Sequence, residues 1–483
     1  MHRKRFFAIS MARALGGFRR MLWDRAVLLL LALVMSGCAL SPRYERPEVA
    51  IPTQWRMGDT GVFADAQNQW WHGFEDPALN QLVEQALENN KDLHIASARV
   101  EEYLGRFSVT RSEQFPQAGA EAAGDRTRTP ATRSASGRAS TGETYQASVL
   151  LSFELDLFGR LRHATAAARA ELLASEEGHR TVLIAVITAV IQNYIQLLEL
   201  DKELEIAKRT LDTRKESLRI SRLRFNAGLT SEMDMQQAQV EYQSTLTQIP
   251  TLEAATAQRE TAIALLLGGN PAPVTRGGSL DRLSIPQVPA GLPSALLERR
   301  PDLRQAEQQL KAAAANVRVA KLAYFPVISL TGLLGYVSPQ LADLFQGPSR
   351  TWSYGGGISV PIFTAGKIAG QVQASEAVQK AALAQYEKAV QSAFGEVEDS
   401  LAALQKGQER LQAVKGQLSA LERYLHLAKL RYQNGYTSYL EVVDAERNLF
   451  NTELTHAQNQ ANIILSLIDL YKAMGGGWVA DET

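Results

Sequence analysis

Apolar residues recur at intervals of seven along two long stretches of the chain. In the first stretch they are Leu183, Val190, Leu197, Leu204, Leu211, Leu218 and Phe225. In the second they are Val390, Val397, Leu404, Leu411, Leu418, Leu425 and Tyr432, each 207 residues after its counterpart. A strict seven-residue apolar repeat is typical of a helix that packs along a coiled-coil seam. We therefore predict two long helices with the same layout.

These helices are predicted to be long and to lose apolar character toward one end. No proline, which would break a helix interior, occurs between Pro130 and Pro250 or after Pro361. A helix from about Arg160 to Phe225 would be roughly 100 Å long at ~1.5 Å per residue. Along the companion seam, apolar Ile187, Tyr194, Phe394 and Leu401 precede Asp201, Lys208, Lys215, Arg222, Gln408, Lys415, Glu422 and Lys429. We expect an elongated helical body with a more charged end.

Each predicted helix ends in nearly the same turn, LRFNAGLTS at Leu223 to Ser231 and LRYQNGYTS at Leu430 to Ser438. Gly228 and Gly435 supply the left-handed residue that ends a helix. The candidate caps of the returning helices are Thr230, Ser231, Thr437 and Ser438. The chain thus makes two helical hairpins, and upstream Asn90 to Leu104 also matches Arg300 to Ala314. We interpret this as a tandem duplication.

Strand-like segments follow the Phe-Pro pair in each half. Apolar and polar residues alternate from Gln146 to Leu157, with Leu150 as the exception, and from Trp352 to Val360. Gln117 to Arg128 and Pro326 to Val337 alternate less cleanly. Such lengths suit tilted strands across a bilayer, apolar outward and polar inward. A soluble four-stranded sheet with one wet face is the alternative.

Four strands are too few to close a membrane barrel, which needs about eight or more. Open sheet edges are not tolerated in lipid, because their backbone groups would have no hydrogen-bond partners. We therefore expect two, three or four chains to share one barrel.

The N-terminal segment predicts export and lipidation. An apolar run from Ala26 to Met35 follows a basic region and is too short to span a bilayer, so residues 1–37 are interpreted as a signal peptide. The start codon at Met1, Met11 or Met21 stays open. MSGC resembles a lipobox, which would make Cys38, the sole cysteine, the lipidated N-terminus. Ordinary signal cleavage is the alternative.

Composition and motifs argue against several other functions. The formal net charge is zero, which gives no support for nucleic-acid binding. The seven histidines show no metal-ligand spacing, and no nucleotide motif is present, so we predict no cofactor, no metal and no enzymatic activity. Trp70 and Trp71 are interpreted as packing residues and not as a binding platform.

Several longer motifs carry a family resemblance. They include CALSPRYERPEVAIPTQW, WWHGFEDPALNQLVEQAL, SFELDLFGRLR, RRPDLRQAE, YFPVISLTGLLG, VPIFTAGK and FGEVEDSLAAL. Together they resemble the TolC-like outer-membrane factor family, in its OprM/NodT-like lipoprotein branch, from Cys38 to about Met474. The resemblance implies a mainly α fold with a membrane β-barrel. It implies a homotrimer with a 12-stranded barrel in outer-membrane lipid, a periplasmic helical tunnel, and a belt of shorter helices.

The resemblance also implies two functional sites. The periplasmic aperture would be narrowed by Leu440, Glu441, Asp444 and Arg447, three of which share one helix face. An ordinary solvated face with intrahelical pairs is the alternative. A periplasmic adaptor would dock at the hairpin tips, which contain Gly228, Thr230, Ser231, Gly435, Thr437 and Ser438.

The predicted function is the outer-membrane channel of a tripartite efflux system, a passive exit duct for small amphiphilic compounds with an adaptor and an inner-membrane pump. A type I-like secretion duct and a non-conducting periplasmic coiled-coil lipoprotein are the alternatives. The predicted spans are a signal peptide (1–37), an anchored segment with waist helices (38–113), barrel strands (114–157 and 326–361), long hairpins (158–269 and 362–474), a waist segment (270–325) and a tail (475–483).

Overall fold

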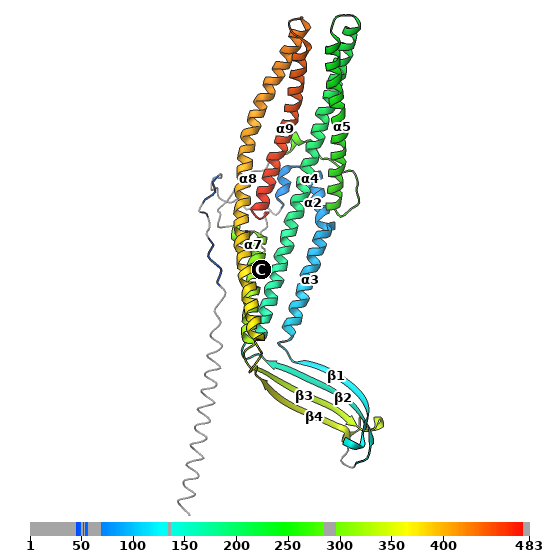
Figure 1. The fold of residues 1–483 in the computed structure, drawn as a ribbon, viewed down its shortest axis with the longest axis vertical. Coiled ribbons are helices and arrows are strands. Elements are labelled where there is room, and N and C mark those ends of the chain that lie inside the picture. Colours follow the sequence, from blue (N-terminus) through cyan, green and yellow to red (C-terminus); the bar gives the residue numbers. More distant parts are fainter. Residues whose placement is uncertain are drawn as a thin grey trace, which may run out of the picture. The chain divides into compact units, whose positions relative to one another are not determined.

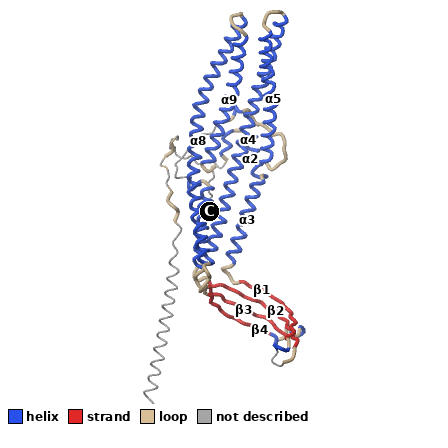
Figure 2. The backbone as a smooth tube through the Cα atoms, viewed as in Figure 1, coloured by secondary structure: helices blue, strands red, loops and turns tan. Residues whose placement is uncertain are grey.

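The computed structural model describes residues 45–49, 52, 54–56, 69–133, 137–284 and 296–476 (Figures 1 and 2). The predicted signal peptide, Cys38 and most of the tail lie outside these residues. The described chain forms two compact units. The sheet unit contains Tyr103–Leu172 and Gln309–Leu383, and the helix unit contains Val49–Glu102, Leu173–Gln308 and Ala384–Thr483.

The sheet unit carries four antiparallel strands in the order β1-β2-β3-β4, coloured red in Figure 2. Their bounds are Gln117–Thr129 for β1, Ser140–Leu155 for β2, Val327–Ser338 for β3 and Arg350–Ser359 for β4. All four predicted strands are therefore confirmed.

The bounds of β2 differ from the prediction at both ends. β2 begins at Ser140 and not at Gln146, because its polar first residues still pair with β1 through the backbone. It ends at Leu155 and not at Leu157, because the Asp156 carboxylate accepts the backbone N–H groups of Leu161 and Arg162 at 3.2 and 2.9 Å. Hydrogen bonds, and not hydrophobic alternation, set both ends.

The long helices repeat with equal lengths. α4 (Arg160–Asn226) and α8 (Lys367–Gln433) have 67 residues each, and the returning helices α5 (Glu232–Leu266) and α9 (Tyr439–Ala473) have 35 each. The two predicted hairpins are confirmed. Pro250 lies inside α5 without ending it, and its side chain is exposed.

The predicted seam is confirmed by burial. None of the fourteen residues of the seven-residue repeat is exposed. Of the companion positions, Ile187 and Tyr194 are buried, whereas Lys208, Lys215 and Arg222 are exposed. α4 also holds an 18-residue stretch apolar enough to cross a membrane, but 56% of that stretch is buried inside the structure. This stretch packs in a protein core.

The main core of the helix unit lies where short helices pack against the long ones. The aromatic residues of η1 (Trp70–Phe74) are buried in it, and Trp70 stacks on Tyr471 with ring centroids 4.2 Å apart. Asp76 caps α2 (Pro77–Asn89) and accepts the Tyr194 hydroxyl at 2.7 Å. The interpretation of Trp70 and Trp71 as packing residues is therefore confirmed.

Two further helices, α3 (Lys91–Ser112) and α7 (Pro301–Leu322), have 22 residues each and end shortly before a Phe-Pro pair. The remaining short elements are α6 (Leu296–Arg299), η2 (Ala131–Arg133), η3 (Leu280–Arg282), η5 (Leu341–Asp343) and η6 (Gly347–Ser349).

Candidate functional site

The strand register separates the sheet into two chemically different faces. Because residues opposite one another on neighbouring strands share a face, each register row identifies one side. We define the apolar face by the rows Ala118–Leu151–Gly332–Tyr354, Ala120–Val149–Leu334–Trp352 and Ala122–Ala147–Tyr336–Arg350. We define the polar face by the rows Gln117–Ser152–Thr331–Gly355 and Glu121–Ser148–Gly335–Thr351.

The apolar face exposes large aromatic side chains. Trp352 and Tyr354 are both exposed and stack with ring centroids 5.7 Å apart. Near the end of the sheet from which the helices leave, the ring centroids of Phe158 and Phe325 are 5.0 Å apart, and Phe363 is exposed. A sheet face of this kind is typical of contact with lipid, with aromatic rings at the two interfaces.

The polar face carries small and hydrophilic side chains. On β4 it presents Ser353, Gly355, Gly357 and Ser359. Leu150, the exception to the alternation of β2, lies opposite Leu333 on this face. Such a surface suits a water-filled passage and leaves room for solutes.

The sheet has two open edges within the described chain. β1 pairs only with β2 and β4 only with β3 among the described strands. Each edge leaves a row of backbone N–H and C=O groups available to another chain.

The hairpin tips are built alike. Gly228 and Gly435 have φ values of 69° and 77°, and nothing lies within 4 Å of a Cβ added at either position. Leu229 and Tyr436 donate their N–H groups to Arg224 and Arg431 at 2.8 and 2.9 Å. Each turn is thus closed by a 6→1 hydrogen bond of the Schellman type.

The two caps differ. The Ser231 hydroxyl accepts the Asp234 N–H at 3.2 Å, whereas Ser438 makes no side-chain cap bond. Thr230 donates to the Asp234 carboxylate at 2.6 Å. Thr437 is half-buried at the equivalent position.

Sequence reasoning missed the apolar residues that the tips expose. Leu229 is 77% and Tyr436 78% exposed, at equivalent positions directly after the turn glycine. In a Schellman turn this residue commonly packs against its own helix. The sequence could have identified Leu229 and Tyr436, because each is an apolar residue directly after a predicted turn glycine.

The predicted aperture residues lie in the first three turns of α9. Leu440 is exposed, and Glu441 pairs with Arg431 of α8 at 3.2 Å. Asp444 pairs with Arg447 at 3.0 Å and accepts Asn448 Nδ2 at 3.1 Å. The structure thus brings Asp444 and Arg447 together within one chain, as in the alternative with intrahelical pairs.

A buried ionic network lies behind this helix and was not anticipated. Arg214 of α4 is 3% exposed, pairs with Glu241 of α5 at 2.9 Å and donates to Thr245 Oγ1 at 2.6 Å. Its guanidinium also lies 5.2 Å from the centre of the Phe450 ring of α9. The network therefore joins the two hairpins near their tips.

Two carboxylates lie farther along α4, away from the tips. Burial, followed by repulsion from Glu203, raises the pKa of Glu199 to about 7. Glu203 is buried and accepts Gln458 Nε2 at 2.7 Å. No group of three or more His, Cys, Asp or Glu side chains among the described residues is arranged to hold a metal ion.

Comparison with known proteins agrees with this geometry. The family model described as outer membrane efflux protein matches residues 82–269 and 292–476, one match in each half of the duplication. The solvent efflux pump outer membrane protein SrpC of Pseudomonas putida is 38% identical over 458 residues, covering 93% of this chain and 97% of SrpC. The cation efflux system protein CusC of Escherichia coli is 34% identical over 452 residues, covering 92% of this chain and 97% of CusC.

A solved structure shows the same fold. The CmeC outer membrane channel of Campylobacter jejuni superposes with a TM-score of 0.85 at 27% identity, covering 92% of this chain and 96% of CmeC. The family is one of transport channels and not of enzymes, as the sequence predicts. The chain therefore belongs to the outer membrane efflux protein family and is the outer-membrane channel of an efflux pump.

Proposed function

We propose that three copies of the chain enclose one water-filled duct, with a barrel of twelve strands in the outer membrane. The observation that carries this proposal is the four-stranded sheet with one apolar face, one polar face and two open edges. Because open edges are not tolerated in lipid, β1 of one chain pairs with β4 of the next until the wall closes. The apolar face then contacts lipid and the polar face lines the passage.

The duct works with a periplasmic adaptor and an inner-membrane pump and releases small amphiphilic compounds. The name of SrpC, which describes a solvent efflux pump, supports a pump as partner and small apolar cargo, whereas the name of CusC describes cation efflux. The sequence contains no nucleotide motif, and we assign both the energy supply and the cargo selection to the pump. In this arrangement the lipidated Cys38 anchors the chain in the outer membrane. The barrel strands cross that membrane, and the waist and the two hairpins extend into the periplasm.

The aperture is formed by three copies of the start of α9. Leu440, exposed in one chain, forms an apolar ring, and Asp444 forms a ring of carboxylates beside it. Carboxylates on a symmetry axis repel one another unless a cation neutralises them. Arg447 is that cation. In the closed aperture it pairs with Asp444 of a neighbouring chain and not with Asp444 of its own chain, and these pairs between chains hold the aperture shut as a latch.

The adaptor docks on the hairpin tips. Small residues at Gly228, Thr230, Ser231, Gly435, Thr437 and Ser438 allow close approach, and exposed Leu229 and Tyr436 supply apolar area. Crosslinking from Ser231→Cys and Ser438→Cys to an adaptor in an active complex tests this. Absence of a crosslink from both positions contradicts docking at the tips.

Single-channel conductance in planar bilayers tests the duct itself. Purified protein should give discrete current steps, whereas a structural coiled-coil lipoprotein would carry none. Asp444→Ala and Arg447→Ala should raise conductance or open probability severalfold, because each removes one partner of the latch. Glu453→Ala, also on α9 but paired with Arg209 of α4 at 2.7 Å, is the matched control and should conduct like wild type. Unchanged current in both aperture variants removes these residues from gating.

A further inference from the structure

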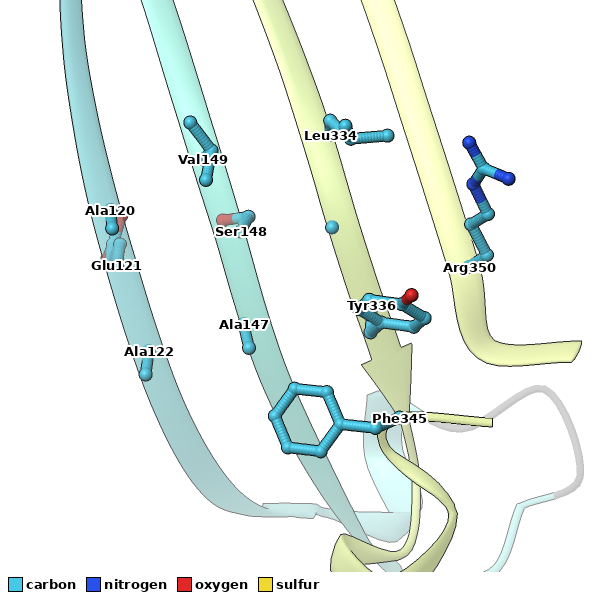
Figure 3. Close-up of a pocket in the computed structure, with 11 residues that line it drawn as sticks. Ala120, Glu121, Ala122, Ala147, Ser148, Val149, Leu334, Tyr336, Phe345 and Arg350 are labelled. Carbon is cyan, nitrogen blue, oxygen red and sulfur yellow. The ribbon is translucent and has the colours of Figure 1, made fainter. Parts of the chain in front are cut away.

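A hollow lies on the apolar face of the sheet, beside the β3–β4 connection (Figure 3). Its volume is about 540 Å³. Its floor is made by Ala120 and Ala122 of β1 and Ala147 of β2. Tyr336 of β3 and Phe345 of the following loop form its walls. The hollow exists because the apolar face of β1 carries only small residues beside Ala147, which lies between the larger Tyr145 and Val149 on β2.

Aromatic side chains define one side of the hollow. The Phe345 ring meets the Tyr336 ring edge to face, with centroids 5.6 Å apart and planes at 66°. Phe345 is nevertheless 72% exposed, so its outer surface is available to a partner. A phenylalanine that extends over an apolar sheet face, and not into a core, suits contact with a hydrocarbon chain.

A positive charge lies at the edge of the hollow. Arg350 shares the register row of Ala122, Ala147 and Tyr336, and its guanidinium forms no hydrogen bond or ion pair with the described residues. Beyond this row toward the loops, Arg126 and Arg128 occupy the same face; Arg126 pairs with Glu143 at 3.3 Å, and Arg128 has no ion pair with the part of the chain that the structure describes. Glu121 also lines the hollow, but by register it lies on the opposite, polar face, so the apolar face here offers an apolar slot with an excess of cationic groups beside it.

The topology identifies the leaflet that this end meets. The β1–β2 and β3–β4 connections lie at one end of the sheet, and the chain leaves for α4 and α8 at the other. With the helices in the periplasm, the hairpin connections lie at the outer leaflet. That leaflet consists of a multiply acylated glycolipid bearing phosphate groups, and Arg binds phosphate through two parallel N–H donors.

We propose that the hollow binds one acyl chain of this outer-leaflet glycolipid while Arg350 binds one of its phosphates. This inference rests on the proposed function, because it needs the apolar face to contact lipid. A neighbouring chain does not compete for the hollow, since neighbours join at the β1 and β4 edges. Exported compounds do not reach it either, since they follow the polar face.

Native mass spectrometry of the purified complex with added bisphosphorylated lipid A tests the inference. Wild type should retain bound lipid, and Arg350→Ala should retain about tenfold less, as expected for a lost charge-assisted hydrogen bond. Phe345→Ala should retain about threefold less, and lipid A without phosphates should bind wild type about as weakly as the bisphosphorylated form binds Arg350→Ala. Arg133→Ala is the control, because this exposed arginine of η2 lies outside the hollow.

Equal retention by wild type, Arg350→Ala and Arg133→Ala overturns the lipid site, as does the absence of bound lipid in wild type. Conductance measured on the same preparations separates the two proposals. Preparations that conduct normally but show no difference in retention contradict only the lipid site, whereas wild type without current contradicts the duct.

Discussion

The two hairpins have the same dimensions but different surroundings. Their helices match residue for residue, with 67 residues out and 35 residues back. Yet α9 buries residues along its whole length and contributes to four separate apolar clusters, whereas the buried side chains of α5 are Ala238, Thr245, Ile263 and Ala264. The two hairpins have equal helix lengths because their turns are alike. Their side chains differ, and for that reason α9, and not α5, is buried along its whole length.

Charge separates the hairpins as well. The residues of α5 equivalent to Leu440, Asp444 and Arg447 are Met233, Gln237 and Val240. Glu441 has a carboxylate equivalent, Asp234, so what only the second hairpin offers to the proposed aperture is the pairing of Asp444 with Arg447. Duplication supplied the scaffold, and divergence confined the Asp444–Arg447 pair to one copy.

The largest expected effect comes from Arg214, which has Leu421 at the equivalent position of α8. Arg214→Ala leaves the largely buried Glu241 carboxylate without its cation and removes one of the two hydrogen-bond partners of the Thr245 hydroxyl, which costs about 4 kcal/mol of stability. Thermal unfolding in detergent should show a large decrease in Tm. Arg219→Ala, at an exposed pair with Glu216, should leave Tm unchanged. Equal Tm values for the two variants would show that the network does not stabilise the hairpins.

A leucine pair tests the difference in packing directly. Leu197 and Leu404 are equivalent positions of the seam, but Leu197 is fully buried and Leu404 only half-buried. Leu197→Ala should lower the free energy of unfolding by about 3 kcal/mol and Leu404→Ala by about half as much. The half-buried Leu404 loses less buried apolar area and leaves a smaller cavity when it is replaced. Denaturant unfolding compares them, and a larger loss at Leu404 would contradict the packing described here.

Glu199 predicts a pH dependence at a position where the second hairpin has the exposed Lys406. The folded-state pKa of Glu199 is about 7, above its usual 4.5, so the folded chain retains this proton to higher pH than the unfolded chain. Its contribution is fully present below about pH 4.5 and is lost as pH rises through about 7.

Glu199→Gln should therefore flatten the fall in Tm between about pH 5 and pH 8. Lys406→Gln is the control and should keep the wild-type profile. An unaltered slope in Glu199→Gln would show that this carboxyl titrates normally in the folded protein.

The turn glycines should behave alike. Gly228→Ala and Gly435→Ala each place a Cβ on a left-handed residue, at about 1 kcal/mol, without a clash. Matching decreases in Tm are expected. A difference of more than twofold between them would break the equivalence of the tips.

The smallest expected difference lies at the caps. Ser231→Ala removes a side-chain cap bond and should cost about 1 kcal/mol, whereas Ser438→Ala removes none and should cost little. The same unfolding assay measures both, and an equal loss would mean that Ser438 caps α9 in solution.

Much of the fold could be predicted because its determinants are local. The seven-residue repeat and the turns at Gly228 and Gly435 predict both hairpins, and alternation predicts the strands. The start of β2 at Ser140 could not be predicted, because its backbone pairing with β1 extends beyond the alternating residues into polar sequence. Pro250 inside α5 shows that tertiary packing tolerates one missing hydrogen bond.

The candidate site was less accessible to sequence reasoning. An isolated arginine such as Arg214 has the same sequence signature whether it is exposed or buried. The hollow at Ala120, Ala122 and Ala147 depends on strand register, which places small residues from two strands in adjacent rows. Whether Asp444 pairs within its chain or with a neighbour depends on the assembly, which one sequence does not encode in its local pattern.

Native mass spectrometry in lipid nanodiscs tests the central claim most directly. The account predicts a single species with three times the mass of one processed chain, persisting after dilution. A stable monomer in the same nanodiscs, with the edges of β1 and β4 open, would contradict the shared duct.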